Sequence, residues 1–272
     1  MARVPQSGGA AVVAWLICAL VGQPNGRGDG WQKHVKGFRR VAFKVVFRMS
    51  ESDSPNGNLG GIEAVRAARI EWRLGQILTA AVKLLSEQGF QKMLITDLAK
   101  EAGVSVGTIY QYVDTKEDIL LLVVNDIIES YRREVPAAME GIEDPVERLA
   151  AGFRAYCLVV DAHRTAALLA YQETKSISKE GRERLMRLEV ETNSYFSDCI
   201  QAGMRLGKFA AVEPAVAAGT LTMLAHMWAL KHWYLNSMFD VQTYIRSQLS
   251  FVMKALIAGE YQKSYSHLVN FS

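Results

Sequence analysis

The segment that most constrains the fold runs from Thr96 to Leu120 and reads TDLAKEAGVSVGTIYQYVDTKEDIL. It predicts two short helices joined by a tight turn, followed by the start of a third helix. Thr96 is expected to cap the first helix. Gly103 can take the left-handed conformation that commonly ends a helix. Ser105 is expected to cap the second helix, because its hydroxyl can accept from a nearby backbone amide.

The second helix carries an unusual surface. Ile109 is expected to pack inward. The positions around it are small, aromatic or hydrogen-bonding, which suits a DNA major groove, where base edges and thymine methyl groups are read. The alternative is an ordinary helical hairpin. The residues expected on the exposed surface are Val106, Gly107, Thr108, Tyr110, Gln111 and Tyr112.

A capping box is expected at residues 115–118, with Asp118 in place of the usual glutamate. Lys116 then lies in a first helical turn, where a cation is unfavourable to the helix dipole. An anionic partner would offset this cost, and we expect that partner to be a DNA phosphate. Thr96 and Ser105 complete the predicted set of DNA contacts.

Residues 76–120, QILTAAVKLLSEQGFQKMLITDLAKEAGVSVGTIYQYVDTKEDIL, resemble the DNA-binding domain of the TetR family of bacterial transcriptional repressors. One departure is Val113, where that family usually has phenylalanine. The resemblance implies an all-α fold: an N-terminal three-helix DNA-binding domain with a helix-turn-helix, and a C-terminal helical ligand-binding and dimerisation domain. It also implies that residues 119–128 transmit ligand binding to the DNA-reading heads.

Composition favours the same fold class. Only six prolines interrupt the 272 residues, and half of the residues are hydrophobic. The net charge of +3 is uneven, because residues 1–61 carry +5 and residues 62–272 carry −2. The predicted DNA-binding domain is therefore not strongly basic. Its phosphate contacts must come from a few placed cations and from backbone amides.

No catalytic pattern is present in the sequence. It has no glycine-rich phosphate loop after a strand, and no HExxH, GxSxG or CxxC motif. We expect neither an enzyme, nor a cofactor, nor a metal site. Three cysteines without metal-ligand spacing fit a reducing cytoplasm. His163, His226 and His232 are interpreted as core or interface residues, with ligand contact as the alternative.

Residues 1–61 are predicted to be a disordered or spurious extension. They contain an apolar run from Ala10 to Val21, shorter than the roughly 20 residues that span a membrane. Three interpretations are possible. The apolar run could be a functional anchor, or residues 1–61 could be a disordered basic arm. Alternatively, residues before the true start could be upstream sequence that is translated only because the start is misassigned. Met49 heads a polar stretch and favours the last interpretation. The predicted domains are 62–120 for DNA binding, 121–260 for ligand binding and dimerisation, and 261–272 as a tail.

Apolar periodicity predicts the remaining helices. Asp144, Ser178 and Asp240 are expected N-caps, with proline directly after Asp144. Arg66, Arg69 and Arg73 lie in or before the first helix, either as solvated surface or as a DNA-contacting arm. The predicted helices are 62–88, 116–134, 145–163, 165–175, 179–207, 214–233 and 241–258.

The second domain is rich in aromatic residues and methionine, which together make an adaptable apolar pocket. The resemblance implies that this domain holds a small hydrophobic inducer. Residues 170–176, preceded by His163 and Arg164, resemble family members that respond to fatty acyl-CoA esters. The predicted ligand-binding residues are Phe153, Tyr156, Arg164, Tyr171, Lys175, Tyr195, Met223 and Met227.

A cationic cluster supports an acyl-CoA, because it would suit a phosphorylated head group. Glutamates interleave with these cations, so a solvated helix face with paired charges is the alternative. The cluster comprises Arg164, Lys175, Arg182, Arg184 and Arg187.

Dimerisation is expected because one short recognition helix contacts too few base pairs, so such proteins bind paired half-sites. We expect a two-fold four-helix bundle of the last two long helices. The residues assigned to this interface are Ala215, Ala217, Ala218, Gly219, Tyr244, Ile245, Leu249, Phe251 and Val252.

The sequence therefore predicts a cytoplasmic homodimeric repressor that binds double-stranded operator DNA and has no membrane association. A hydrophobic small molecule, with an acyl-CoA as one candidate, would release it. One alternative is a repressor of an efflux pump induced by lipophilic drugs. Another is a helical lipid-binding protein or enzyme whose helix-turn-helix does not bind DNA.

Overall fold

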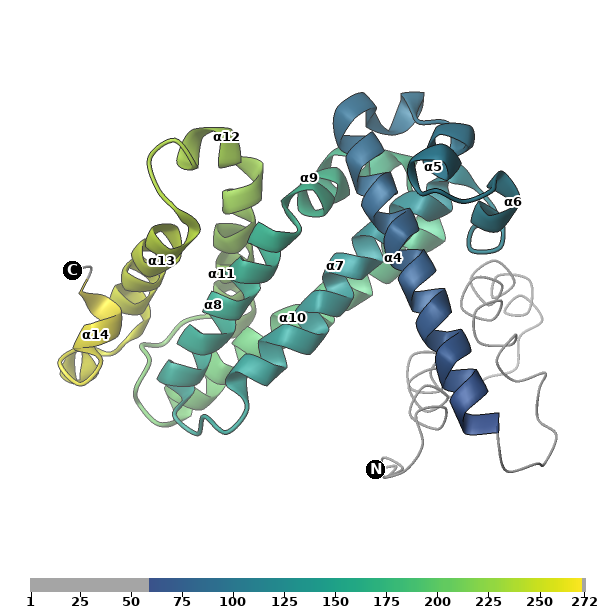
Figure 1. Cartoon of the computed structure of the whole chain (residues 1–272). Helices are drawn as coiled ribbons and strands as arrows, with labels where there is room; N and C mark the ends of the chain where they lie inside the picture. Colours follow the sequence, from purple (N-terminus) through teal and green to yellow (C-terminus); the bar gives the residue numbers. More distant parts are fainter. Residues whose placement is uncertain (1–58, 271–272) are drawn as a thin grey trace. The chain divides into compact units, whose positions relative to one another are not determined.

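The computed structural model describes residues 59–270. All secondary-structure elements named in this range are α-helices or short 3-10 helices (Figure 1). The only β pairing among these residues is an isolated bridge between Phe209 and Ile257. The predicted all-α fold is confirmed. The N-terminal extension was predicted for residues 1–61, of which residues 1–58 lie outside the described range and residues 59–61 are helical. The side chains of Arg66 and Arg184 are not described either.

Three helices form the N-terminal part of the described range. They are α4 (Leu59–Lys92), α5 (Ile95–Glu101) and α6 (Val106–Ile109). The path of α4 changes at Gly89, whose φ of 77° lies in the left-handed region, so the predicted helix end there is confirmed. Phe90 follows and is buried.

The rest of the described chain is also helical. Its elements are α7 (Lys116–Met139), α8 (Pro145–Ala162), α9 (Arg164–Gln172), η1 (Thr174–Ser176), α10 (Lys179–Arg205), α11 (Pro214–Leu230), α12 (His232–Leu235), α13 (Val241–Leu256), η2 (Gly259–Tyr261) and α14 (Ser266–Val269). The division into domains made from the sequence stays a prediction.

Side-chain caps start three of these helices where the sequence predicts them. The Asp144 carboxylate accepts from the amides of Val146 and Glu147 at the start of α8. The Ser178 and Asp240 side chains accept from amides three residues ahead, at the starts of α10 and α13. These boundaries follow from local hydrogen bonding.

Several helix ends differ from the prediction by a few residues, and α9 ends at Gln172 rather than at residue 175. α7 continues five residues past Glu134 and includes Pro136. The helix predicted through Trp233 breaks at Lys231, where α11 ends and α12 begins one residue later. The prediction rested on apolar periodicity and was wrong at this point. Trp233 is 78% exposed, so it does not belong to the buried apolar face of α11.

α8 packs against α7, α10, α11 and α13, so it forms the centre of the C-terminal bundle. Phe153 and Tyr156 on α8 are fully buried, as are Phe196 on α10 and Trp228 on α11. α10 approaches the following loop closely at Gly203, where a Cβ atom would lie 2.2 Å from Cδ2 of Phe209. A larger residue there would displace this buried ring.

Most of the predicted dimer contacts on α13 are wrong. Tyr244, Ile245, Leu249 and Val252 are buried within the chain. α13 packs against α8, α11 and α14, so its apolar face is already covered. Phe251 is the exposed residue of that set, at 68%.

The end of the described chain is tied to the bundle. α14 packs on α13, and the Ser250 hydroxyl donates to the Val269 carbonyl over 2.6 Å. The Tyr265 hydroxyl donates to the Asp144 carboxylate over 2.7 Å. Within residues 59–270, no helix has both the length and the apolar character needed to cross a membrane.

Candidate DNA-binding surface and ligand pocket

The turn between α5 and α6 has the geometry expected of a helix-turn-helix. Gly103 takes a φ of 64°, and the amide of Val104 donates to the Ala99 carbonyl over 2.9 Å. The Ser105 hydroxyl accepts from the amide of Thr108 over 3.1 Å and lies 2.9 Å from its hydroxyl oxygen. The predicted cap at Ser105 is confirmed.

The predicted cap at Thr96 is wrong. α5 begins at Ile95, with Leu94 at the N-cap position and no side-chain cap bond. Thr96 therefore lies inside the first turn, where its side chain is exposed. A cap needs an extended residue one position before the helix, and Leu94 occupies that position here.

The surface of α6 and the turn after it is open at most of the predicted positions. Val106, Gly107, Tyr110 and Gln111 are exposed, and Tyr110 retains 47% of its accessible area. Thr108 is half-buried.

Tyr112 was expected on this surface, and that expectation is wrong, because its side chain is only 7% exposed. α6 ends at Ile109, and the chain then turns, with the Tyr112 amide donating to the Ile109 carbonyl. Helical spacing therefore does not apply to Tyr112, and it packs inward beside the fully buried Val113.

Lys116 has a protein partner that the sequence did not reveal. The capping box around it is confirmed, with Thr115 and Asp118 exchanging hydrogen bonds. The Lys116 ammonium donates to the Gln91 carbonyl over 3.0 Å and lies 4.7 Å from the Phe90 ring centroid. An ammonium has three donors, so this bond leaves capacity for a phosphate. Lys116 also joins the start of α7 to the end of α4.

A second interaction joins helices of this part. Lys83 on α4 forms an ion pair with Glu101 on α5, with 2.7 Å between the charged atoms. Arg69 and Arg73 lie within α4, where Arg69 is exposed and Arg73 is half-buried.

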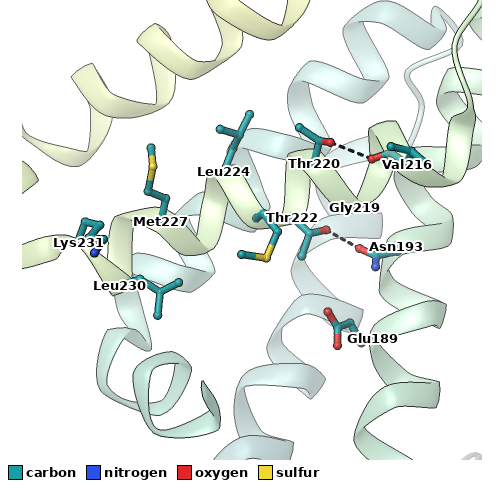
Figure 2. Close-up of a pocket in the computed structure, with 11 residues that line it drawn as sticks. Glu189, Asn193, Val216, Gly219, Thr220, Thr222, Leu224, Met227, Leu230 and Lys231 are labelled. Carbon is teal, nitrogen blue, oxygen red and sulfur yellow. Dashed lines mark hydrogen bonds between the residues drawn. The ribbon is translucent and has the colours of Figure 1, made fainter. Parts of the chain in front are cut away.

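A pocket of about 650 Å³ is lined mainly by α11, with Glu189 and Asn193 contributed by α10 (Figure 2). Its lining is mostly apolar, and the Thr222 hydroxyl donates to the Asn193 side chain across the two helices. Met223 and Met227 were predicted to bind ligand and are part of this lining. The lining residues are Glu189, Asn193, Val216, Gly219, Thr220, Thr222, Met223, Leu224, Met227, Leu230 and Lys231.

A polar cluster adjoins the pocket, formed by Tyr131 on α7, Tyr156 on α8, Tyr171 on α9 and His226 on α11; we call it the His226 cluster. The Tyr131 and Tyr156 hydroxyls lie 3.1 and 3.3 Å from Nε2 of His226, and the Tyr171 hydroxyl lies 2.8 Å from Nδ1. The Tyr171 hydroxyl also contacts the Met223 sulfur at 3.5 Å. One imidazole therefore links four helices and reaches the pocket lining.

The His226 cluster is uncharged near neutral pH. Burial lowers the pKa of His226 to about 4, so its imidazole is neutral. Burial also raises the pKa of Tyr131 and of Tyr156, so both keep their protons. The rings of Tyr131 and Tyr156 stack in parallel with centroids 4.0 Å apart. The cluster offers neutral donors and acceptors only.

The other predicted ligand residues are dispersed. Phe153 is core and does not line the pocket. Arg164 is bonded to the carboxylate and the carbonyl of Asp161. Lys175 is exposed in η1, and Tyr195 is half-buried. Of the predicted cationic cluster, Arg182 donates to the Ile177 carbonyl, and no described member lines the pocket.

The central member of the His226 cluster was not among the predicted ligand residues, and neither was Tyr131. His226 follows Met223 by three positions on α11, which places the two on one face. That spacing was the available signal. The convergence of Tyr131, Tyr156 and Tyr171 on it depends on contacts between helices that the sequence does not encode locally.

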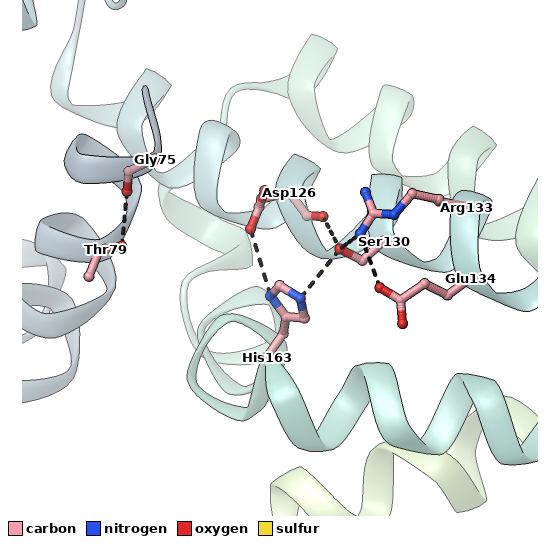
Figure 3. Close-up of polar contacts among 7 residues, drawn as sticks. All are labelled: Gly75, Thr79, Asp126, Ser130, Arg133, Glu134 and His163. Atoms are coloured by element: carbon pink, nitrogen blue, oxygen red, sulfur yellow. Dashed lines mark hydrogen bonds and ion pairs between the residues drawn. The ribbon is translucent and has the colours of Figure 1, made fainter. Parts of the chain in front are cut away.

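A second histidine, His163, lies between α8 and α9 and contacts α7 (Figure 3). Nδ1 of His163 lies 3.7 Å from the Asp126 carboxylate, and Nε2 lies 3.3 Å from the Ser130 hydroxyl. The order of these groups resembles a catalytic triad, but Ser130 is buried and its hydroxyl donates to the Asp126 carbonyl. The group therefore connects helices and presents no accessible nucleophile.

An exposed helix-turn-helix, joined through α7 to a helical domain with its own pocket, defines a helix-turn-helix DNA-binding protein. The family described as bacterial regulatory proteins, tetR family, matches residues 77–123. The family described as tetracyclin repressor-like, C-terminal domain, matches residues 143–237. The chain belongs to the TetR family of bacterial transcriptional regulators.

Curated relatives support this assignment. The HTH-type transcriptional regulator HbdR of Aromatoleum sp. (strain CIB) is 38% identical over 191 residues, covering 70% of this chain and 83% of that protein. The fatty acid metabolism regulator protein of Bacillus subtilis (strain 168) is 31% identical over 115 residues, covering 42% of this chain and 55% of that protein. The relatives are transcriptional regulators and not enzymes, and this chain is a regulator of the same kind.

A solved structure shows the same fold. AibR, in complex with isovaleryl coenzyme A and operator DNA, superimposes with a TM-score of 0.59 at 17% identity. The match covers 67% of this chain and 99% of AibR. At this identity the similarity concerns the fold alone.

Proposed function

We propose that this regulator is a homodimeric repressor whose affinity for its operator falls when a hydrophobic small molecule binds beside the His226 cluster. The observation that carries the proposal is the bond from Tyr131 on α7 to His226 on α11. α7 begins at the helix-turn-helix and contacts α4, α8, α9 and α10. A ligand that moves His226 thereby acts on the helix that directly follows the helix-turn-helix.

The DNA contacts come from α6 and the helix ends near it. The residues that face the bases and the adjoining backbone are Val106, Gly107, Thr108, Tyr110 and Gln111. The exposure of all of them except the half-buried Thr108 supports this assignment. Contacts to phosphates come from Thr96, Ser105 and Lys116. Two copies of α6, one from each protomer, read two half-sites about one helical turn apart.

The partner protomer covers exposed apolar side chains on α11, α12 and α13 and on the segment between α12 and α13. Such a concentration of large apolar side chains on a surface is typical of a protein interface. Buried Tyr244, Ile245, Leu249 and Val252 support α13 from within. The exposed side chains are Val216, Trp233, Tyr234, Met238, Phe239 and Phe251.

The inducer is an acyl compound, with an acyl-CoA ester as the candidate. The AibR structure contains isovaleryl coenzyme A together with operator DNA, and the B. subtilis relative is a fatty acid metabolism regulator. The apolar pocket lining is compatible with an acyl chain. Ligand binding shifts the population toward a conformation in which the two heads no longer match the operator.

The test is selection of bound fragments from genomic DNA by the purified full-length protein, followed by titration of a selected fragment with acyl-CoA esters. We expect a dimer in light scattering, binding to a two-fold symmetric site, and release by at least one ester. A monomer with no preference for any fragment over random competitor DNA would refute the DNA-binding proposal. Intact operator binding that no ester weakens would refute the inducer class.

A further inference from the structure

α4 is longer than its packing requires. Its first buried side chain among the described residues is Ile77, although the helix begins at Leu59. Every described side chain between Val65 and Gln76 is exposed or half-buried. Figure 1 shows this N-terminal half of α4 projecting clear of the other helices. Packing supplies most of the stability of a helix in a protein, so a projecting helix of this length is expected to have a partner.

Two arginines on the projecting half continue the stripe of α4 that packs inside the protein. The stripe consists of Arg69, Arg73, Ile77, Ala80 and Leu84, whose spacings of four, four, three and four residues place them on one side of the helix. Ile77, Ala80 and Leu84 are buried, whereas Arg69 is exposed and Arg73 is half-buried. The stripe therefore changes from apolar to cationic at the point where the fold no longer covers it.

This side of α4 is the side on which the helix-turn-helix begins. α4 packs against α5 and α7. Lys83 follows Ala80 by three positions and forms the ion pair with Glu101 on α5. Arg69 and Arg73 thus lie on the same side of α4 as α5. Arg69 precedes Ile77 by eight positions, which is about 12 Å along the helix axis.

Neither guanidinium is paired with a carboxylate in the described part of the chain. The ion pairs of lysine and arginine found there all belong to other residues, namely Lys83, Arg132, Arg133, Arg164, Lys179 and Lys208. A guanidinium presents its donors as a planar fork that matches the geometry of a phosphate. Two such groups four positions apart on an open helix face suit a polyanion with regularly spaced phosphates.

The two arginines lie at the opposite end of α4 from Lys116, which bonds the Gln91 carbonyl. Arg73 and Gly89 are sixteen positions apart, which is about 24 Å along the helix. This separation is a large part of one turn of B-DNA, whose length is about 34 Å. Cations at the two ends of α4 would therefore reach different phosphates.

We propose that Arg69 and Arg73 bind backbone phosphates of the duplex that flanks the half-site read by α6. This inference rests on the proposed function, because it assumes that α6 lies on the operator. Contacts to the backbone carry no base preference of their own. They lengthen the DNA that each protomer occupies, and they raise the affinity in a manner that depends on salt.

The experiment compares operator duplexes that differ only in length, using the full-length protein and fluorescence anisotropy. One duplex carries about ten base pairs, one helical turn, outside each half-site, and the other ends at the half-sites. We expect the protein to bind the longer duplex about tenfold or more tightly, whatever the sequence of the flanks. Equal affinity for the two duplexes, or a preference that changes with the flanking sequence, would overturn the proposal.

The double variant Arg69→Gln, Arg73→Gln should lose the preference for the longer duplex. We also expect the slope of log K against log salt concentration to fall by about two units. The variant Arg69→Lys, Arg73→Lys should retain most of both effects, because an ammonium also binds phosphate. Arg154→Gln, Arg205→Gln removes the same charge from exposed positions on α8 and α10 and is the matched control. If the control lost the preference as well, net charge would be the cause, and the proposal would be wrong.

The two proposals fail separately in this experiment. If the operator is bound but the length of its flanks has no effect, the inference about Arg69 and Arg73 fails, and recognition by α6 stands. If the protein prefers no fragment over random competitor DNA, the proposed function itself fails.

Discussion

Tyr171 on α9 and His226 on α11 are joined by a hydrogen bond of 2.8 Å between the tyrosine hydroxyl and Nδ1 of the imidazole. The other nitrogen of the same ring faces Tyr131 on α7. A neutral imidazole has one donor and one acceptor, so a change in the bond on one side alters what the other side can offer. This ring is therefore suited to connect the pocket with α7.

Tyr171→Phe should separate ligand response from DNA binding. The substitution removes the hydroxyl that joins His226 to Met223 and leaves the ring. We expect operator affinity to be nearly unchanged, and the ligand concentration needed for release to rise about fivefold or more. Fluorescence anisotropy of a labelled operator measures both. Tyr261→Phe, far along the chain in η2, is the control and should behave as wild type.

Gly107→Ala tests whether α6 approaches DNA closely. A Cβ atom at Gly107 would meet only the Ser105 Oγ atom, at 3.7 Å, so the free protein can accept it. Alanine is the better helix former, so the free energy of unfolding should be unchanged or rise by up to about 1 kcal/mol. Operator affinity should fall about tenfold or more.

Gly75→Ala on α4 is the matched control for this substitution, since a Cβ atom at Gly75 would have no neighbour within 4 Å. It should not change operator affinity. If the Gly107→Ala protein bound the operator as tightly as wild type, α6 would not be in close contact with the bases at this position.

Lys116→Ala should weaken binding to all DNA sequences alike. If Lys116 contacts one phosphate, the slope of log K against log salt concentration should fall by about one unit. Loss of the bond to the Gln91 carbonyl should cost about 1 kcal/mol of stability. Lys254→Ala on α13 controls for net charge. An unchanged slope would leave Lys116 with a structural role alone.

Trp233→Glu and Phe251→Glu should dissociate the dimer. Both side chains are largely exposed in the single chain, so a charge there leaves the protomer fold intact and opposes burial against a partner. Light scattering should show a monomer with weakened operator binding. Met186→Glu, at an exposed apolar position on α10, should remain dimeric. A dimeric Trp233→Glu, Phe251→Glu double variant would place the interface elsewhere.

His226 should make the protein less stable in acid. Burial lowers the pKa of His226 to about 4 in the folded protein. Between about pH 6.5 and pH 4 the unfolded chain therefore binds a proton at His226, whereas the folded chain does not. Stability should therefore decline as pH falls from about 6.5 to about 4, by up to about 3 kcal/mol from this residue. Urea unfolding across this range measures it. His226→Gln should flatten the decline, whereas His267→Gln, at an exposed position, should not.

Much of the helix-turn-helix and of the capping was predictable from the sequence. The Ser105, Thr115, Ser178 and Asp240 side chains each cap a helix by bonding an amide three residues ahead. Such bonds involve neighbours along the chain, so residue type and spacing determine them. Gly103 ends a helix for the same local reason.

Contacts between distant residues were decided only by the tertiary structure. Tyr112 packs inward because the chain turns after Ile109, and the interface assigned to α13 is covered by α8, α11 and α14. His226 meets Tyr131, which is 95 positions away along the chain. A sequence indicates which face of a helix is apolar, but not which partner covers that face. The helix-turn-helix was therefore evident from the sequence. The His226 cluster was not, because it forms only when α7, α8 and α9 pack against the His226 imidazole of α11.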